Sequence, residues 1–357
     1  MRISVCMIVR NEENHLRRCL DSVCELADEI IVGDTGSTDT TLSIAREFNA
    51  QIILISWAED FSAARNACLA CATGDWILWM DADEELQISD AAVMRGVLSE
   101  TMANILPARL INYYGADPPD ARRSYLSTAF RVHRRTPLIT FQGRIHEHLS
   151  FPEELSPQFI LSLPIQILHY GYMDQAKEQK TGRNLKMILE EREKHPEDPW
   201  VDYHLAAETL NLGYLDCAQA AIDKALAGFI LRGTLPPALV YRLKYQILLQ
   251  SKAYDIVERG LQKVLRFYPD YVDLVFFKGI AELQQKKFKE AILSFSNCLN
   301  LGEDHADYLI LSGTGSFWAL YYLSICYRQE NDPVAEEYFM RQALQHYPEA
   351  EANLLDF

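Results

Sequence analysis

The sequence has too few basic residues for a general nucleic-acid-binding protein. Its 357 residues include 34 Lys and Arg against 50 Asp and Glu, which gives a formal net charge of −16 at pH 7. A protein that holds a nucleic-acid backbone carries a basic surface, and this composition argues against one. No nucleic-acid partner is therefore expected, although the total charge leaves room for a local basic group.

Long apolar runs are also missing. Residues 1–9 are largely apolar, but the run is too short for the apolar region of a secretory signal peptide, and no cleavage site follows it. No other run reaches the length that a helix needs to cross a bilayer. We therefore expect a cytoplasmic protein without a transmembrane segment.

Paired cysteines with the spacing of a zinc site are absent. The chain has eight cysteines, of which Cys68 and Cys71 alone form a Cys-x-x-Cys pair. Without a second pair, this spacing does not indicate a zinc site. The other cysteines are scattered through apolar patterns, as expected for reduced thiols that pack as small hydrophobic side chains in a cytosolic protein.

The composition that remains is that of an ordinary globular protein, with 49% hydrophobic and 24% charged residues. The length suggests two domains, or one domain followed by a repeat array. In the first half, stretches with helical spacing separate short apolar runs, which indicates parallel βαβ units and a doubly wound, nucleotide-binding α/β sheet over residues 1–174. The expected strands are 3–9, 29–33, 51–55, 75–80, 127–133 and 165–169, with helices near 16–23, 41–48 and 62–72; from about residue 104 the pattern loosens, and 113–120 reads as a surface loop.

The second half, residues 175–357, has almost no strand signal. A charged amphipathic helix is expected over 175–195, ended by Pro196 and Pro199. Helical pairs follow with a degenerate, unevenly spaced pattern of small residues, aromatic residues and a closing proline, which is typical of tetratricopeptide repeats. A generic helical bundle is the alternative. Either arrangement stacks helices into an extended surface that suits a peptide or another subunit.

A short acidic cluster ends the apolar run at residues 76–80. Asp81 and Asp83 lie two residues apart, and side chains with this spacing on an extended chain point the same way. Ligands of open α/β sheets bind at the carboxyl ends of the strands. The pair is therefore suited to a hard divalent cation that shares its oxygen ligands with a diphosphate. The alternative is an acidic loop that starts a helix.

Asp34 and Arg65 are two further candidates near the same edge of the sheet. Asp34 follows a strand directly and can accept a hydrogen bond from a nucleobase, while Arg65 can offer its planar guanidinium to a phosphate. The alternatives are a helix cap for Asp34 and a surface ion pair for Arg65.

Four segments together resemble the family 2 glycosyltransferases, namely residues 5–13, 31–41, 61–66 and 79–85. Ile145-His146-Glu147 and His169-Tyr170 resemble a subgroup of that family. The helical second half resembles members fused to tetratricopeptide repeats, which include peptide S-glycosyltransferases that act on bacteriocin precursors. The resemblance implies a GT-A fold, a Rossmann-like sheet that binds a nucleotide sugar, and transfer with inversion at the anomeric carbon.

The resemblance also implies roles for the residues at matching positions. Asp34 would contact the nucleobase, and Asp81 would approach the ribose or the sugar. Glu147 would be the general base, with Glu84 and Glu85 as alternatives, because the sequence lacks the separate Glu-Asp pair of many relatives. The implied set is: catalytic Glu147 and Asp81; donor-binding Val9, Asn11, Glu12, Asp34, Arg65, Asp81 and Ala82; and metal-binding Asp83 and His169, for Mn²⁺ or Mg²⁺.

These observations predict a metal-dependent, inverting hexosyltransferase that moves a sugar from a UDP-sugar to a Ser, Thr or Cys side chain of a protein or peptide held by the repeats. One alternative is an acceptor in a cell-envelope glycan or a lipid-linked sugar. Another is a repeat scaffold with an inactive transferase-like domain. Self-association into a homodimer is a further hypothesis.

Overall fold

The computed structural model describes residues 1–155 and 163–348 of the chain. Contacts along the chain divide it into two compact units. The first comprises Met1–Pro119 and Ser127–Lys177, and the second comprises Asp120–Leu126 and the chain from Glu178 onward. The short stretch Asp120–Leu126 therefore packs with the second unit, although it lies within the range 1–174 that the sequence assigns to the first domain.

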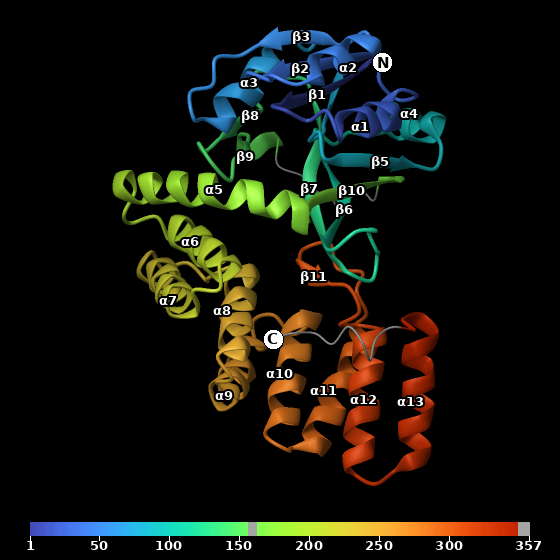
Figure 1. Ribbon diagram of the computed structural model, residues 1–357, viewed down its shortest axis with the longest axis vertical. Helices are drawn as coiled ribbons and strands as arrows, with labels where there is room; N and C mark the ends of the chain where they lie inside the picture. The colour runs from blue at the N-terminus through green and yellow to red at the C-terminus, as the bar shows by residue number, and fades with distance from the viewer. Residues whose placement is uncertain (156–162, 349–357) are drawn as a thin grey trace. The chain divides into compact units, whose positions relative to one another are not determined.

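The first unit is built around a mixed sheet with the strand order β3-β2-β1-β4-β7-β6-β10-β5 (Figure 1). β1 runs parallel to β2 and β4, and β2 runs parallel to β3. β7 is antiparallel to β4, whereas β10 is parallel to β6 and antiparallel to β5. The bounds are β1 Ile3–Val9, β2 Glu29–Asp34, β3 Gln51–Leu54, β4 Trp76–Trp79, β5 Glu84–Ile88, β6 Ile105–Gly115, β7 Ser124–Arg134 and β10 Ile165–Met173.

Helices cover both faces of this sheet. They are α1 Leu16–Val23, α2 Thr41–Glu47, α3 Phe61–Cys71 and α4 Ala91–Glu100, and a small second sheet pairs β8 Thr140–Gln142 with β9 His148–Ser150. On β4, Trp76 and Leu78 pack with α1, while Trp79 packs on the opposite face with Cys68 of α3. A strand covered on both faces reads as one continuous apolar run. The α/β fold expected for the first half is confirmed.

One strand contradicts the sequence-based expectation. The pattern loosens after residue 104 and a loop is expected over 113–120, but β6 extends from Ile105 to Gly115, so the first three residues of that expected loop belong to a strand. Pro107 and Arg109 interrupt its apolar residues, so the alternation is too weak to indicate a strand.

The second unit consists of helices that pack in antiparallel pairs (Figure 1). α6 packs on α7, α8 on α9, α10 on α11 and α12 on α13. Their bounds are α6 Pro199–Asn211, α7 Leu215–Leu231, α8 Ala238–Gln250, α9 Tyr254–Val264, α10 Val272–Gln284, α11 Phe288–Leu301, α12 Phe317–Gln329 and α13 Pro333–His346, preceded by α5 Asp174–Lys194. The expected helical repeat domain is confirmed.

Small residues in the repeat pattern allow these helices to approach closely. A Cβ atom added at Gly279 would stand 2.8 Å from the Phe295 ring. Ala291 and Ala343 are fully buried in the same core. The pattern of small and aromatic residues along the chain therefore reflects the contacts between paired helices.

The unit departs from a regular repeat between α11 and α12. Residues 302–316 contain the short strand β11, Ile310–Leu311, which pairs with Tyr125 and Leu126 at the start of β7. Glu303 holds this connection by accepting hydrogen bonds from the backbone of Gly313 and Gly315, both at 3.0 Å. The added segment explains the longer spacing before the last helical pair.

A buried ion pair joins several parts of the second unit. Arg242 Nε of α8 donates to Asp273 Oδ2 of α10 at 2.7 Å, and the two residues are 5% and 0% exposed. Asp273 also accepts from the backbone of Leu311 and from Thr314 Oγ1. The Arg242 guanidinium lies over the ring of Tyr125, 5.1 Å from its centroid. This cluster therefore connects α8, α10, β11 and the segment 120–126.

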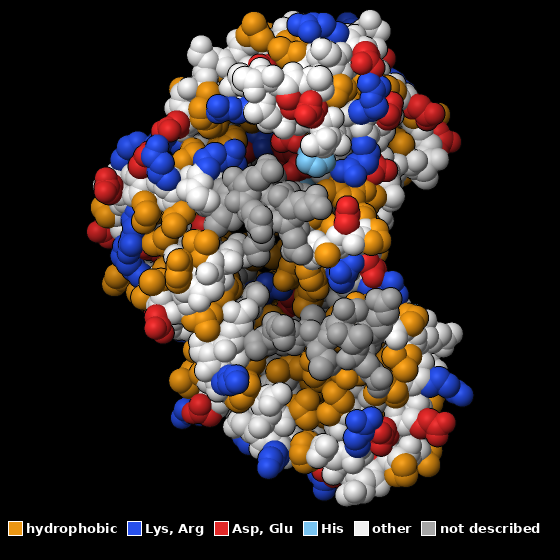
Figure 2. All heavy atoms as spheres, in the orientation of Figure 1, with side chains coloured by type: hydrophobic (Ala, Val, Ile, Leu, Met, Phe, Trp, Pro, Cys, Tyr) orange, Lys and Arg blue, Asp and Glu red, His pale blue; other side chains and the backbone are white. Residues whose placement is uncertain are grey.

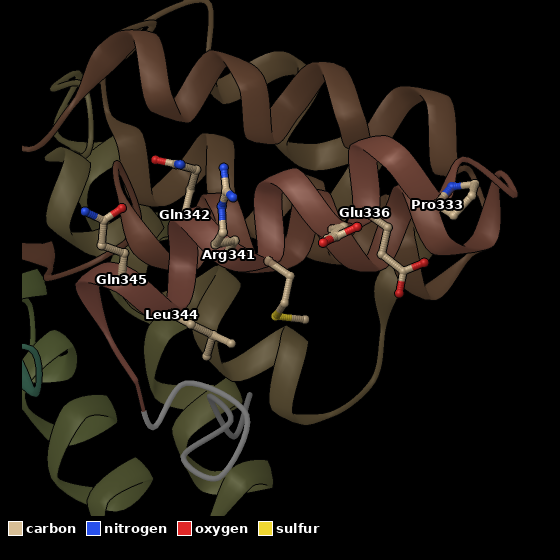
Figure 3. A pocket seen from close by; sticks show the side chains of 8 residues that line it. Pro333, Glu336, Arg341, Gln342, Leu344 and Gln345 are labelled. Carbon is tan, nitrogen blue, oxygen red and sulfur yellow. The ribbon is translucent and has the colours of Figure 1, made fainter.

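A surface hollow of about 920 Å³ lies along α13 (Figure 3). Its wall combines apolar Met340 and Leu344 with Glu336 and Arg341. It belongs to the second unit, whereas the acidic residues and His169 singled out in the sequence belong to the first.

All eight cysteines are free thiols, and five of them are buried. Among the described residues, no helix is long and apolar enough to cross a membrane.

Replacing Asp273 should destabilise the second unit strongly. Asp273→Ala leaves Arg242 buried without its carboxylate and removes the acceptor for Leu311 and Thr314. Breaking a buried pair from one side costs about 3–5 kcal/mol. The midpoint of urea unfolding should fall accordingly, while Asp255→Ala, which breaks an exposed pair with Arg259, should leave it nearly unchanged. Equal midpoints for the two variants would refute this account of the cluster.

Candidate active site

The loops after β1 and β2 are tied to each other by hydrogen bonds. The carbonyl oxygen of Val9 accepts from the backbone of Thr35 at 3.0 Å. Asn11 donates its backbone N–H to Ser37 Oγ at 3.0 Å and accepts from the Thr38 backbone through Oδ1 at 2.8 Å. Its φ of 56° lies in the left-handed region, which asparagine tolerates well. The two loops therefore form one fixed rim at the carboxyl ends of their strands.

Asp34 shapes this rim from inside. It is 3% exposed, and its carboxylate accepts hydrogen bonds from the backbone N–H groups of Gly36 and Ser37, both at 3.1 Å. Asp34 therefore caps its own turn. The N-terminus of α2 is instead served by Asp39, whose Oδ1 accepts from Thr41 N at 3.0 Å.

Glu12 lies on the same rim. Its backbone N–H donates to Thr41 Oγ1 at 2.8 Å, and its carboxylate contacts His15 Nδ1 at 2.9 Å. Val9, Asn11, Glu12 and Asp34, the residues expected to border the nucleoside, are thus brought together at the ends of β1 and β2.

The acidic segment that follows β4 is a turn and not an extended chain. The Glu84 backbone N–H donates to the carbonyl oxygen of Asp81 at 3.0 Å, and β5 begins at Glu84. The prediction that Asp81 and Asp83 lie on an extended chain is therefore wrong, and so is the alternative that this segment starts a helix. Asp83 and Ala82 are 8% and 4% exposed, so the turn is held well inside the unit.

Two arginines neutralise the carboxylate of Asp81. Arg65 Nη2 lies 3.1 Å from its Oδ1, and Arg131 Nη2 lies 3.0 Å from its Oδ2. Trp79 Nε1 also donates to Oδ1, at 3.3 Å. Although burial raises it, these two guanidiniums lower the pKa of Asp81 to about 2. Asp81 is therefore an anion at any physiological pH.

Glu84 supports the turn from below. Its carboxylate is fully buried, accepts the backbone N–H of Asp81 at 2.8 Å and forms an ion pair with Arg131. Burial raises the pKa of Glu84 to about 7, against the opposing effect of Arg131. Because both of its carboxylate oxygens are bound inside the fold, we assign Glu84 a structural role.

The alternative base Glu85 is engaged as well. Its Oε2 accepts from the hydroxyl of Tyr170 at 2.8 Å and lies 3.8 Å from Arg18 Nε. Of the three carboxylates considered for the base, Glu147 is the one that does not pack along β5.

Arg65 is buried and forms ion pairs with two carboxylates. It is 9% exposed, and its Nη2 contacts Glu147 Oε1 at 2.5 Å as well as Asp81. Its guanidinium carbon lies 4.7 Å and 5.1 Å from the ring centroids of Trp79 and Phe141. Its Nε and Nη1 have no hydrogen-bond partner among the described residues, while the guanidinium as a whole lies over these two rings. Arg65 is thus neither a surface pair nor an exposed phosphate-binding fork in this structure.

Glu147 lies in the loop between β8 and β9. The preceding His146 has φ 54°, so residues 143–147 form an irregular loop and not a strand. The side chain of Glu147 is 12% exposed. Through Arg65, it is brought near Asp81, although 66 residues separate them in the sequence.

His169 faces the acidic turn from β10. Its Nε2 lies 3.6 Å from Asp83 Oδ1, and its Nδ1 lies 2.9 Å from Asn112 Oδ1. Asn112 Nδ2 donates to Ser127 Oγ at 3.0 Å, which leaves Oδ1 as the acceptor for His169 Nδ1–H. In the neutral imidazole, Nε2 then carries the lone pair that faces Asp83.

The charge around His169 favours its protonated form when no cation is bound. Burial lowers the pKa of His169, but the hydrogen bond and charge of Asp83 raise it to a net value above the ordinary one. Figure 2 shows one face of the molecule, on whose upper part both acidic and basic side chains lie.

Among the residues that the structure describes, protein side chains alone do not complete a metal site. Within residues 1–155 and 163–348, no group of three or more His, Cys, Asp or Glu is arranged to hold a metal ion. Asp83 and His169 supply one oxygen and one nitrogen. Mg²⁺ commonly binds through one or two carboxylates plus substrate phosphates, so this small donor set suits a cation that a diphosphate helps to hold.

Two further residues of this site, Arg131 and Asn112, are not singled out by the sequence. Arg131 belongs to a group of basic residues between 131 and 144, and nothing in the sequence separates it from Arg134 or Arg135. Asn112 lies on β6, the strand that was not expected. Neither position carries a local signal, because each meets its partner only when distant strands pair.

Comparison with known proteins identifies the family of this site. The family model described as Glycosyl transferase family 2 matches residues 4–150. The TPR repeat-containing protein Synpcc7942_0270 of Synechococcus elongatus is 34% identical over 286 residues, which cover 78% of this chain and 68% of that protein. The SPbeta prophage-derived glycosyltransferase SunS of Bacillus subtilis is 28% identical over 342 residues, which cover 92% of this chain and 78% of that protein.

A solved structure aligns with about half of this chain. MamA from Desulfovibrio magneticus RS-1 aligns with 47% of this chain and 86% of its own, at 16% identity and a TM-score of 0.40.

Removing Arg131 should destabilise the first unit, and neutralising Glu84 should restore much of the loss. Arg131→Met leaves Glu84 buried without a cation, which costs about 3–5 kcal/mol. Arg131→Met with Glu84→Gln removes that charge while keeping an acceptor for the Asp81 backbone. The double variant should therefore unfold at higher urea concentration than Arg131→Met alone. A double variant as unstable as the single one would contradict the assigned pairing.

Proposed function

Because the chain belongs to the family 2 glycosyltransferases, we propose that it transfers a sugar from a UDP-sugar to a Ser, Thr or Cys side chain of a protein or peptide. The transfer would invert the anomeric carbon and depend on Mn²⁺ or Mg²⁺. The observation that supports this proposal is the convergence of the rim after β1 and β2, the acidic turn after β4, and Glu147 on one edge of the first unit's sheet.

The donor would lie against the rim formed by the loops after β1 and β2. Asp34 would accept a hydrogen bond from a nucleobase N–H, and the backbone near Val9 with Asn11 and Glu12 would border the nucleoside. The hydrogen bonds that join these loops fix the rim before the donor arrives. Preorganisation of this kind lowers the cost of ordering the site on binding.

Asp83 and His169 fit a divalent cation by the chemistry of their donor atoms. The Nδ1–H of His169 is held by Asn112, which is the outer hydrogen bond that metal-binding histidines usually make. A cation held there would neutralise charge on the departing nucleoside diphosphate. Asp81 and Ala82 would form the floor beneath the sugar.

Glu147 would act as the general base. In this role its carboxylate takes the proton of the acceptor hydroxyl or thiol as the acceptor oxygen or sulfur forms a bond to the anomeric carbon. The bond from that carbon to the diphosphate oxygen breaks on the opposite side, so the configuration inverts. Arg65 would keep Glu147 and Asp81 in register with each other before the acceptor arrives.

The helical repeats of the second unit favour the proposal that the acceptor is a polypeptide. Stacked helical pairs present an extended surface, and such surfaces commonly hold peptides. The experiment that tests the proposal incubates the purified protein with Mn²⁺, UDP-glucose or UDP-N-acetylglucosamine, and peptides that contain Ser, Thr or Cys. Mass spectrometry should find peptides that have gained one hexose or N-acetylhexosamine. Label from the donor that follows lipid or glycan instead would favour a cell-envelope acceptor.

Asp83→Asn should weaken the binding of UDP in the presence of Mn²⁺ by about tenfold or more, because it removes an anionic ligand. Calorimetric titration of UDP with and without Mn²⁺ measures this loss. The exposed Asp75→Asn provides a matched control that should bind normally. If Asp83→Asn binds UDP as tightly as the unaltered protein does, the metal assignment is wrong. If the unaltered protein binds no uridine nucleotide, the inactive-scaffold alternative gains support.

Glu147→Gln should slow sugar transfer by about 10²–10⁴-fold with little change in donor affinity, because glutamine fills the same space but cannot accept the proton. Initial rates of UDP release at saturating donor, together with the dissociation constant of UDP, separate the two effects. An unchanged rate would remove Glu147 from the reaction.

A further inference from the structure

We propose that α3 positions the loop that carries Glu147, with Asn66 as the residue that holds this loop in place. The inference rests on the proposed role of Glu147 as the base. It gives Phe61, Ser62, Arg65 and Asn66 a function that differs from direct contact with the donor.

The loop in question, residues 143–147, has little structure of its own. Gly143 has φ 97° and His146 has φ 54°, so two of its residues adopt left-handed backbone conformations. It connects the short strands β8 and β9, which pair only with each other. Ordering such a segment costs conformational entropy, which contacts from outside the loop must offset.

Those contacts come from one side of α3. The amide of Asn66 brackets the backbone of Phe141: its Nδ2 donates to the Phe141 carbonyl oxygen at 2.9 Å, and its Oδ1 accepts from Phe141 N–H at 2.8 Å. Ser62 Oγ donates to the Gly143 carbonyl oxygen at 2.6 Å. The Phe61 backbone N–H donates to the Arg144 carbonyl oxygen at 3.0 Å.

The same helix then reaches the base itself. Arg65, one position before Asn66, contacts the Glu147 carboxylate through Nη2. Phe61, Ser62, Arg65 and Asn66 recur at the spacing of one helix face. Figure 1 shows α3 beside β8, in agreement with their contacts. One helical face therefore fixes the chain from Phe141 to Glu147.

Asn66 is a positioning residue in this scheme. Its amide nitrogen and oxygen both bind the backbone of Phe141. Asn66 would therefore act on the reaction through Glu147 and not by touching the substrate. A base must lie within hydrogen-bond reach of the proton that it takes. A displacement of about 1 Å by a remote change can cost about 10²-fold in rate.

Asn66→Asp is the sharpest test. Aspartate has the same shape and can still accept from Phe141 N–H, but its second oxygen would face the Phe141 carbonyl oxygen where an N–H now donates. UDP release from UDP-glucose with Mn²⁺ should slow by about 10–100-fold, while the dissociation constant of UDP should stay within about twofold of its original value. Ala63→Asn, which places an amide on the exposed side of α3, is the control and should retain full activity.

A double variant tests whether Asn66 acts through Glu147. When two residues act as one unit, removing the second adds little to the loss from the first. Asn66→Asp with Glu147→Gln should therefore be about as slow as Glu147→Gln alone. A double variant slowed by the product of the two single losses, or Asn66→Asp at full speed, would overturn the inference.

Hydrogen exchange provides a readout that needs no turnover. Backbone amides of residues 141–147 should exchange faster in Asn66→Asp, and to a smaller extent in Ser62→Ala, whereas Ala63→Asn should match the unaltered protein. Unchanged exchange in both loop variants would refute the positioning role even if Asn66→Asp proved inactive. If Glu147→Gln turns over normally while the loop variants exchange faster, the proposed base is wrong and the anchoring of the loop stands. Should Asn66→Asp fail to fold, Ser62→Ala carries the same comparison.

Discussion

The carboxylates of Asp81, Glu84 and Glu147 can lie close together only because two arginines neutralise their charge. Arg65 shares one nitrogen between Asp81 and Glu147, and Arg131 shares one between Asp81 and Glu84. Buried carboxylates without such partners would be expensive or would take up protons. The turn after β4 and the position of the loop after β8 both depend on this arrangement.

The arrangement also divides the carboxylates by task. Glu84 is fully buried and holds the backbone of the turn, while Asp81 is kept ionised by both arginines. Asp83 faces His169, and Glu147 lies at the end of the network on an irregular loop. The four acids differ in their neighbours and can therefore differ in role. Glu84 stabilises the fold and Asp81 stays ionised, whereas in the proposed function Asp83 would bind the cation and Glu147 would take the proton. The helix that supplies Arg65 also supplies the contacts that we assign to the positioning of Glu147.

Sequence reasoning predicted the elements with strong periodicity and missed those whose partners are distant. The apolar runs of β1, β2 and β4 and the small residues of the repeats each carry a local pattern. β6 carries no such pattern, because Pro107 and Arg109 interrupt its apolar residues. Asn112 lies on this strand and was therefore not predicted as part of the site. Asp81 and Asp83 were predicted at the end of a strand, as found, but in an extended conformation where the structure has a turn. An apolar run does not reveal where a turn begins. The pairing of β11 with the start of β7 joins Ile310 to Leu126 and Leu311 to Tyr125, which are 184 and 186 positions apart in the sequence. No local pattern predicts it.

In the proposed function, Asp83 and His169 would hold the cation that a uridine diphosphate shares. Pulsed electron paramagnetic resonance of bound Mn²⁺ in the presence of UDP tests it most directly, because an imidazole ligand couples its nitrogen nucleus to the metal. The account predicts a nitrogen coupling that disappears in His169→Gln, together with a phosphorus coupling from the nucleotide. A Mn²⁺–UDP complex without nitrogen coupling, or one unaltered by His169→Gln, would contradict it.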